Sequence, residues 1–351
     1  MSINTLAYPN GLFPDSNGRV TITFYAICIL GGALLALFLS NYHAHKDGYD
    51  WTFFDTIFLV AFPAGIIGAR IWYVIATWPE TSGMTNFFGY GSNWVWKPFA
   101  IWEGGLAIQG GAIAGVLAGM IFIKLRRKGT HILRAADFAV PTIIVAQAVG
   151  RWGNFFNQEV FGHAVSAEAW NFLPSFITSN MQNGGQVMLS GVMIPKGSVA
   201  APLFLIEGVI NVMFYFLISY GLKALEGKHY EEGDTTFAYF IAYGIIRAVL
   251  EPLRNPAFIM GEGSNGTSAS RTDFKSYMMA LAFVAIGLIL IFLNHLVKNL
   301  SRKGKLDNVP IISRFTEKHD EATRLDIEEV RKEDERKSPE SQGNNIREKK
   351  E

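Results

Sequence analysis

Cysteine is almost absent from this chain of 351 residues. The one cysteine, Cys28, lies in an apolar stretch, and a single thiol excludes an internal disulfide and a thiolate metal cluster. His43 and His45 have no cysteine or carboxylate pattern around them. A Gly-x-Ser-x-Gly motif and a Cys–His dyad are also lacking, which argues against acyl transfer through a covalent enzyme intermediate. We therefore expect neither a metal site nor a cofactor.

Charge is scarce as well. Asp, Glu, Lys and Arg make up 17% of the residues, against roughly 25% in soluble domains. The charges are sparse in residues 1–300 and dense in residues 301–351. No basic face is evident outside short loops, so nucleic-acid binding is not expected. No internal repeat is visible, which weakens a transporter interpretation, since many transporters contain paired halves.

Long apolar runs, in contrast, are frequent, and half of the residues are hydrophobic. A helix that crosses a bilayer needs about 20 mainly apolar residues. The first run lacks a small-residue cleavage site, so we expect a retained helix rather than a signal peptide. The sequence predicts an all-α integral membrane protein with a bundle of seven transmembrane helices. These lie near residues 22–39, 53–78, 100–123, 136–150, 200–222, 235–252 and 277–297.

Basic residues give the bundle a direction. Lys and Arg gather at 124–128, after the third predicted span, and at 298–305, after the seventh. Such clusters are typical of cytoplasmic loops, so we expect the N-terminus outside and the C-terminus in the cytoplasm. We divide the chain into a membrane domain, 1–300, with an aromatic-rich outer loop at 151–199, and a charged cytoplasmic tail, 301–351. The tail is expected to be mobile, with a surface helix at Thr316–Arg336 as the alternative.

Glycines recur along the third predicted span. Gly111, Gly115 and Gly119 are four residues apart and share one face of a helix. Small residues in this pattern allow two membrane helices to approach closely. The stripe therefore predicts helix packing.

Polar groups within the spans are costly and are functional candidates. With the predicted topology, they fall in the outer half of the bilayer, and Gln109 lies roughly 9 Å deeper than Glu103 on the third helix. Scattered placement by chance would put them at both faces. The set comprises Tyr25, Arg70, Tyr73, Glu103, Gln109, Arg151, Arg247 and Glu251.

The sixth predicted span carries a stripe of polar side chains. Tyr239, Tyr243, Arg247 and Glu251 follow one another at i, i+4 spacing and so lie on one helix face. A lone arginine near a helix end often only reaches toward the interface, which does not explain four aligned groups. The alternative is an internal Arg247–Glu251 pair that fixes packing.

The fourth predicted span ends in an anion-binding pattern. Arg151 stands between two glycines, and its planar fork suits a phosphate. Asn154 and Asn157 add neutral hydrogen-bonding groups. The alternative is a helix-ending turn with an interfacial arginine. Two arginines at headgroup depth favour a phospholipid phosphate, with a soluble anion as the other option.

Residues 150–162 resemble the signature of the bacterial prolipoprotein diacylglyceryl transferases, GRxGNFxNxExxG, at every fixed position. The similarity extends over residues 20–298, including 68–73, 102–105 and 243–247. It implies an enzyme that moves the diacylglyceryl group of phosphatidylglycerol to the lipobox cysteine thiol of a preprolipoprotein signal peptide. Glycerol phosphate would leave, in the bacterial cytoplasmic membrane, with the active site toward the outer leaflet.

The resemblance and the polar pattern together give a set of candidate site residues. Those expected to be catalytic are Arg151, Arg247, Tyr243 and Gln109. Those expected to bind substrate are Tyr25, Arg70, Glu103, Asn154, Asn157, Glu159, Gly162, Glu251 and Arg254.

One position departs from the family pattern. Many members have a histidine where this chain has Gln109, and an amide is no general base. A free thiol, with a pKa near about 8.5, is already partly ionised at neutral pH, so stabilising the phosphate leaving group is the larger demand. We assign Gln109 a positioning hydrogen bond and leave the base open, with Tyr243 and Glu251 as weaker candidates.

Two other functions stay open. One is a transporter or flippase for an anionic lipid or solute, which needs polar groups in the inner half of the membrane. Asp137 is the obvious candidate there, and a helix-start carboxylate explains it. The other is a catalytically inactive, lipoprotein-binding homologue, which Gln109 keeps open.

Overall fold

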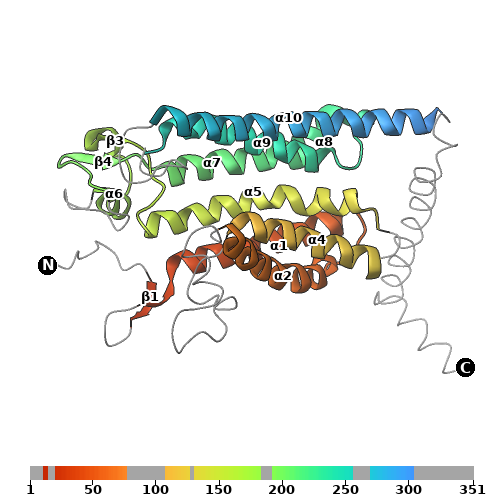
Figure 1. Cartoon of the computed structure of the whole chain (residues 1–351), viewed down its shortest axis with the longest axis horizontal. Coiled ribbons are helices and arrows are strands. Elements are labelled where there is room, and N and C mark those ends of the chain that lie inside the picture. Colours follow the sequence, from red (N-terminus) through yellow and green to blue (C-terminus); the bar gives the residue numbers. More distant parts are fainter. Residues whose placement is uncertain are drawn as a thin grey trace, which may run out of the picture. The chain divides into compact units, whose positions relative to one another are not determined.

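The computed structural model describes residues 11–14, 20–76, 107–126, 130–182, 192–255 and 269–303 (Figure 1). The chain forms two compact units. The first contains residues 1–39 and 136–305, and the second contains residues 40–135 and 306–351. Each unit is described by itself.

The first unit is built mainly from long helices. In Figure 1, α5, α7, α9 and α10 run alongside one another as extended rods. Helix α7 continues through a π-helical turn, Leu217–Gly221, into the short α8, Leu222–Glu226. The long helices are α1 (Phe24–Lys46), α5 (Ile132–Phe156), α7 (Leu203–Phe216), α9 (Asp234–Leu250) and α10 (Ala269–Arg302).

Six stretches among the described helices are long and apolar enough to cross a membrane. They coincide with six of the seven predicted spans, so a mainly helical, multi-pass membrane protein is confirmed. The predicted span at 100–123 overlaps α4 (Ile108–Arg126), which is not one of the six; seven spans and their orientation stay predictions. The six are Phe24–Lys46, Phe53–Ala76, Ile132–Phe156, Leu203–His229, Asp234–Leu253 and Tyr277–Arg302.

The outer faces of these helices suit lipid rather than water. Leu59 and Ile75 of α2 (Phe53–Ala76) are 70% and 62% exposed, and Phe292 of α10 is 66% exposed. Apolar surface on this scale marks contact with another apolar phase. Lipid acyl chains fit this requirement along helices of membrane-spanning length.

The second unit shows why the third predicted span is rich in glycine. Helices α2 and α4 pack closely there. A Cβ added at Gly111 would lie 3.2 Å from the carbonyl oxygen of Gly65, and one at Gly115 would lie 3.3 Å from that of Ala61. The predicted packing role of the glycine stripe is confirmed.

Two short two-stranded sheets accompany the helices, which the all-helical prediction did not include. Strand β1 (Gly11–Pro14) pairs antiparallel with β2 (Val20–Thr23), and β3 (Ala164–Ser166) pairs with β4 (Ser198–Ala200) in the register Val165–Val199. Apart from Ala200, the β3–β4 sheet lies within the predicted outer loop.

That loop is a packed subdomain rather than a simple connection. It contains the 3-10 helix Ala167–Trp170 and α6 (Ser175–Gln182). Buried side chains join it to the adjoining ends of α5 and α7, and its aromatic content follows from this core. The core includes Phe155, Phe161, Ile177, Ile194 and Phe204. The predicted tail, in contrast, lies outside the described residues except for 301–303.

Asp137 has a structural role in the first unit. Its carboxylate accepts hydrogen bonds from the backbone amides of Gly233 (2.6 Å) and Thr236 (2.8 Å), and from the hydroxyls of Thr236 (2.7 Å) and Tyr230 (3.0 Å). The sequence predicted a carboxylate at the start of its own helix. The helix that it caps is α9 instead, because its oxygens reach the free amides at that helix's first turn.

We expect Asp137→Ala to lower the free energy of unfolding by about 3 kcal/mol, since buried amide and hydroxyl donors would lose their acceptor. Thermal unfolding of the purified protein in detergent checks this. Asp47→Ala is the control, because the Asp47–Arg134 ion pair is partly exposed and is expected to contribute less than about 1 kcal/mol. Equal effects of the two substitutions would contradict the assignment.

Candidate functional site

The end of α5 carries an arginine that pairs with a neighbouring helix. Arg151 Nη2 lies 2.5 Å from Glu207 Oε1 of α7, and Nη1 donates to Asn154 Oδ1 at 3.4 Å. The Arg151 side chain is 24% exposed. The guanidinium is therefore paired with a carboxylate and still partly accessible.

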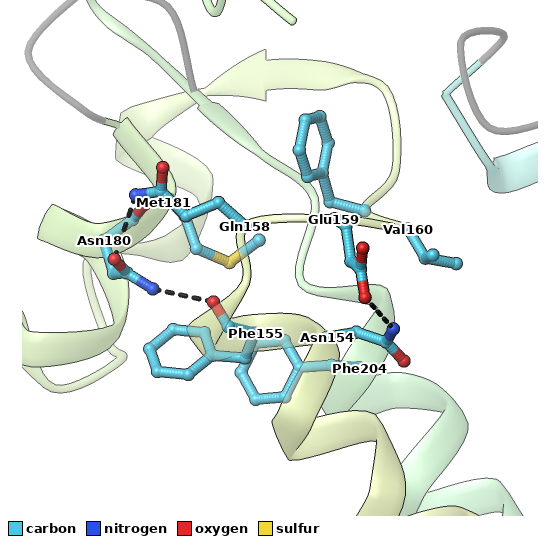
Figure 2. A pocket seen from close by; sticks show the side chains of 9 residues that line it. Asn154, Phe155, Gln158, Glu159, Val160, Asn180, Met181 and Phe204 are labelled. Atoms are coloured by element: carbon cyan, nitrogen blue, oxygen red, sulfur yellow. Dashed lines mark hydrogen bonds between the residues drawn. The ribbon is translucent and has the colours of Figure 1, made fainter. Parts of the chain in front are cut away.

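In the turn after α5, the carboxylate of Glu159 contacts Asn154, the hydrogen-bond partner of Arg151. Asn154 Nδ2 donates to Glu159 Oε1 at 3.0 Å, and Asn157 Nδ2 approaches the same oxygen at 3.4 Å. Figure 2 shows the side chains of Asn154 and Glu159 facing one another. The structure thus brings together Arg151, Asn154, Asn157 and Glu159, as the sequence predicted.

Two glycines of this segment are required by close approach. A Cβ at Gly153 would lie 2.7 Å from Cδ2 of Tyr25, in the first turn of α1. A Cβ at Gly162 would lie 2.7 Å from Ala201 Cβ and 2.9 Å from the carbonyl oxygen of Leu253. Tyr25 also lies within electrostatic range of Glu159 and Arg151, so the structure places it near these two residues; its role in binding stays a prediction.

The polar stripe of α9 is present. The rings of Tyr239 and Tyr243 stack with centroids 6.2 Å apart, and Arg247 Nη2 lies 3.1 Å from Glu251 Oε2. The Tyr239 hydroxyl accepts a hydrogen bond of 3.2 Å from Gln147 of α5. The Arg247–Glu251 ion pair, which was the alternative explanation of the stripe, therefore exists. The polar stripe also continues beyond this pair to Tyr243 and Tyr239.

A third arginine joins this pair. Arg254 Nε lies 3.5 Å from Glu251 Oε2, and Arg254 also forms a β-bridge with Gly162. Burial, and next the positive charge of Arg247, lowers the pKa of Arg254 to about 10, so it stays protonated at neutral pH. Arg151 and Glu207 also act on Arg254 electrostatically, which places the ends of α5, α7 and α9 around one polar region.

The structure does not test whether three other predicted residues belong to this group. Arg70 lies in the second unit, is 5% exposed, and places its guanidinium 5.5 Å from the ring centroid of Tyr73. Gln109 lies in the first turn of α4, also in the second unit. Glu103 lies outside the described residues. The membership of Arg70, Gln109 and Glu103 in the site stays a prediction.

Glu207 was missed by the sequence reasoning, although a signal was present. It is a carboxylate inside the apolar run of α7, and the rule that singled out Arg151 and Arg247 applies to it equally. The sequence around Glu207 did not predict that this residue pairs with Arg151. Among the described residues, no group of three His, Cys, Asp or Glu side chains could hold a metal ion.

Together, the spanning helices and the charged groups at their ends define a multi-pass membrane protein with arginines and carboxylates clustered at its helix ends. Residues 15–293 match the family model described as prolipoprotein diacylglyceryl transferase. A phosphatidylglycerol–prolipoprotein diacylglyceryl transferase of Streptococcus equi subsp. equi (strain 4047) is 34% identical over 284 residues, 81% of this chain and 95% of the relative. One from Streptococcus pyogenes serotype M1 is 34% identical over the same shares. The chain belongs to the prolipoprotein diacylglyceryl transferase family.

We expect Gly162→Ala to lower the free energy of unfolding by about 2 kcal/mol, because the new methyl group would overlap with backbone and side chain. Gly208→Ala in α7 is the control, since its Cβ would meet only the carbonyl oxygen of Ala148 at 3.8 Å. Thermal unfolding of both variants checks the prediction. A Gly162→Ala variant as stable as the native protein would contradict the close contacts found at Gly162.

Proposed function

We propose that this chain transfers the diacylglyceryl group of phosphatidylglycerol to prolipoproteins, the reaction named for its relatives. The observation that carries the proposal is the intact family signature at residues 150–162, folded so that Arg151 and Asn154 are in contact. The transfer is a step of lipoprotein maturation. The thiol that reacts belongs to the substrate, so Cys28 of this chain is not required.

Phosphatidylglycerol enters laterally from the outer leaflet. Arg151 and Arg247 hold its phosphate, and Tyr25, Asn154 and Tyr243 orient the headgroup. The lipobox cysteine of the bound signal peptide loses its proton and attacks the glycerol carbon. A C–S bond forms while the C–O bond to phosphate breaks, giving a thioether and glycerol phosphate.

The pattern of ion pairs supports a phosphate ligand. Arg247 and Arg254 both lie against the one carboxylate of Glu251, at 3.1 and 3.5 Å. Two cations on one anion leave net positive charge in a site whose side chains are nearly buried. A phosphate supplies the balancing charge, and preorganised arginines stabilise the additional charge on a departing phosphate.

The topology that fits this chemistry has the site at the outer leaflet of the bacterial cytoplasmic membrane. Lys124 and Arg126 end α4, and Lys298 and Arg302 end α10, which supports cytoplasmic placement of both helix ends. Residues 1–300 then form a seven-span catalytic domain, and residues 301–351 form a cytoplasmic tail.

The transporter alternative loses its main candidate. Asp137 was the obvious polar group for a path through the inner half of the membrane. Its carboxylate accepts three hydrogen bonds from the start of α9 and one from the Tyr230 hydroxyl. An ion or solute would have to compete with all four. The structural role explains this residue without transport.

The purified protein, given phosphatidylglycerol and a lipobox peptide, is expected to form thioether-linked diacylglyceryl peptide, measured by mass spectrometry. Arg151→Ala and Arg247→Ala should each lower turnover about 100-fold or more, because each removes a charge from the phosphate site. Arg134→Ala, which removes an arginine paired with Asp47 outside the site, is the control.

The outcomes separate the alternatives. Absence of the thioether product under conditions where a streptococcal relative works would refute the transferase assignment. Full activity of both arginine variants would leave the reaction but refute this site. Movement of phosphatidylglycerol between leaflets, without product, would favour the flippase.

Gln109→His tests whether a histidine base matters in this chain. We expect turnover to change by less than about tenfold, because the thiol is already partly ionised near neutral pH. The comparison uses the native chain and the variant at one pH in the same assay. An inactive native chain that gains activity with histidine would instead identify a catalytically inactive homologue.

A further inference from the structure

The turn that carries Glu159 has an unusual backbone. Gln158 and Val160 have φ values of +49° and +55°, and they are the two non-glycine residues with positive φ among the described residues. This left-handed region is unfavourable for residues with a side chain, and most so for a β-branched one such as Val160. Such a conformation persists only where the surroundings hold it.

A buried asparagine from the outer subdomain holds this turn. Asn180 of α6 donates from Nδ2 to the carbonyl oxygen of Phe155 at 2.8 Å. Gln158 Nε2 in turn donates to Asn180 Oδ1 at 3.0 Å and to the Asn180 carbonyl oxygen at 2.9 Å. Both side chains are nearly inaccessible, at 3% and 2% exposed. Figure 2 shows Asn180 on the side of the turn away from Glu159.

The consequence of the held turn is the direction of Glu159. With positive φ at the residues on both sides of Glu159, its carboxylate accepts a hydrogen bond from Asn154 Nδ2. The Oδ1 atom of Asn154 in turn accepts a hydrogen bond from Arg151. A chain of contacts therefore runs from Asn180 through Gln158 and Glu159 to the arginine. Asn180 itself lies outside the signature at 150–162.

We propose that Asn180 is a positioning residue of this site, which fixes the Gln158–Val160 turn so that Glu159 and Asn154 orient Arg151. The inference rests on the proposed function, because it concerns the phosphate site of that reaction. Asn180 touches no reacting group. Its effect on transfer is indirect and depends on the strained backbone.

The dependence on strain gives a specific test. Asn180→Ala is expected to lower kcat/KM for phosphatidylglycerol about tenfold and leave KM for the lipobox peptide unchanged. Adding Val160→Gly should restore at least half of the loss, because glycine adopts positive φ without a steric penalty. Val165→Gly in the same background is the matched control, since Val165 lies in β3 without positive φ, and it should restore nothing. Asn171→Ala, an exposed asparagine of the same subdomain, should leave activity unchanged.

Hydrogen exchange gives a second measurement that needs no turnover. In Asn180→Ala, the amides of residues 158–162 should exchange at least tenfold faster than in the native chain, and Val160→Gly should reverse this. Native kinetics together with native exchange in Asn180→Ala would overturn the inference. So would equal restoration by Val160→Gly and Val165→Gly, which would show a general stability effect.

The two proposals fail in different ways. If the native chain makes no thioether product, the transferase assignment fails, and the exchange data alone decide whether Asn180 holds the turn. If the native chain is active and Asn180→Ala matches it in both measurements, the positioning role fails while the transferase stands.

Discussion

The ion pair between Arg151 and Glu207 is the constraint on which the site depends. A guanidinium at the end of a membrane helix is costly to desolvate without a partner, and Glu207 Oε1 lies 2.5 Å from it. The pair requires the ends of α5 and α7 to meet, although 46 residues separate them (157–202). The segment between the two helices must therefore fold back on itself. Its aromatic core, in which the ring centroids of Phe155 and Phe204 are 4.7 Å apart, packs beside the pair.

This pairing also bears on how the proposed reaction turns over. A lipid phosphate that binds Arg151 competes with Glu207, so the arginine exchanges one anion for another and is charge-paired in both states. Under the proposed function, phosphate binding then costs little new desolvation, and Glu207 pairs with Arg151 again once glycerol phosphate has left. The pair of Arg247 and Arg254 differs, because both arginines share Glu251. It gains an anion rather than exchanging one, which makes it the stronger source of attraction.

Local pattern predicted much of this arrangement. Apolar length indicated the helices, and i, i+4 spacing placed Tyr239, Tyr243, Arg247 and Glu251 on one face, because both depend on residues close in sequence. The signature similarly brought Arg151, Asn154 and Glu159 into one turn. Long-range partners were not predictable in this way. Neither Asp137 capping α9 nor Asn180 contacting Phe155 has a periodic signal, since each pairing depends on how distant segments return.

Asn154 shows why the residue type matters as much as the charge around it. An amide has one accepting and one donating end. Its oxygen faces the Arg151 cation, and its nitrogen faces the Glu159 anion. Aspartate would repel Glu159, and an apolar side chain would leave both neighbours without this link. The amide thus connects opposite charges in a fixed order, so the direction of the Glu159 side chain affects the orientation of Arg151 through Asn154. A strained turn held by a buried hydrogen-bond cluster is the kind of support that such a directional link requires.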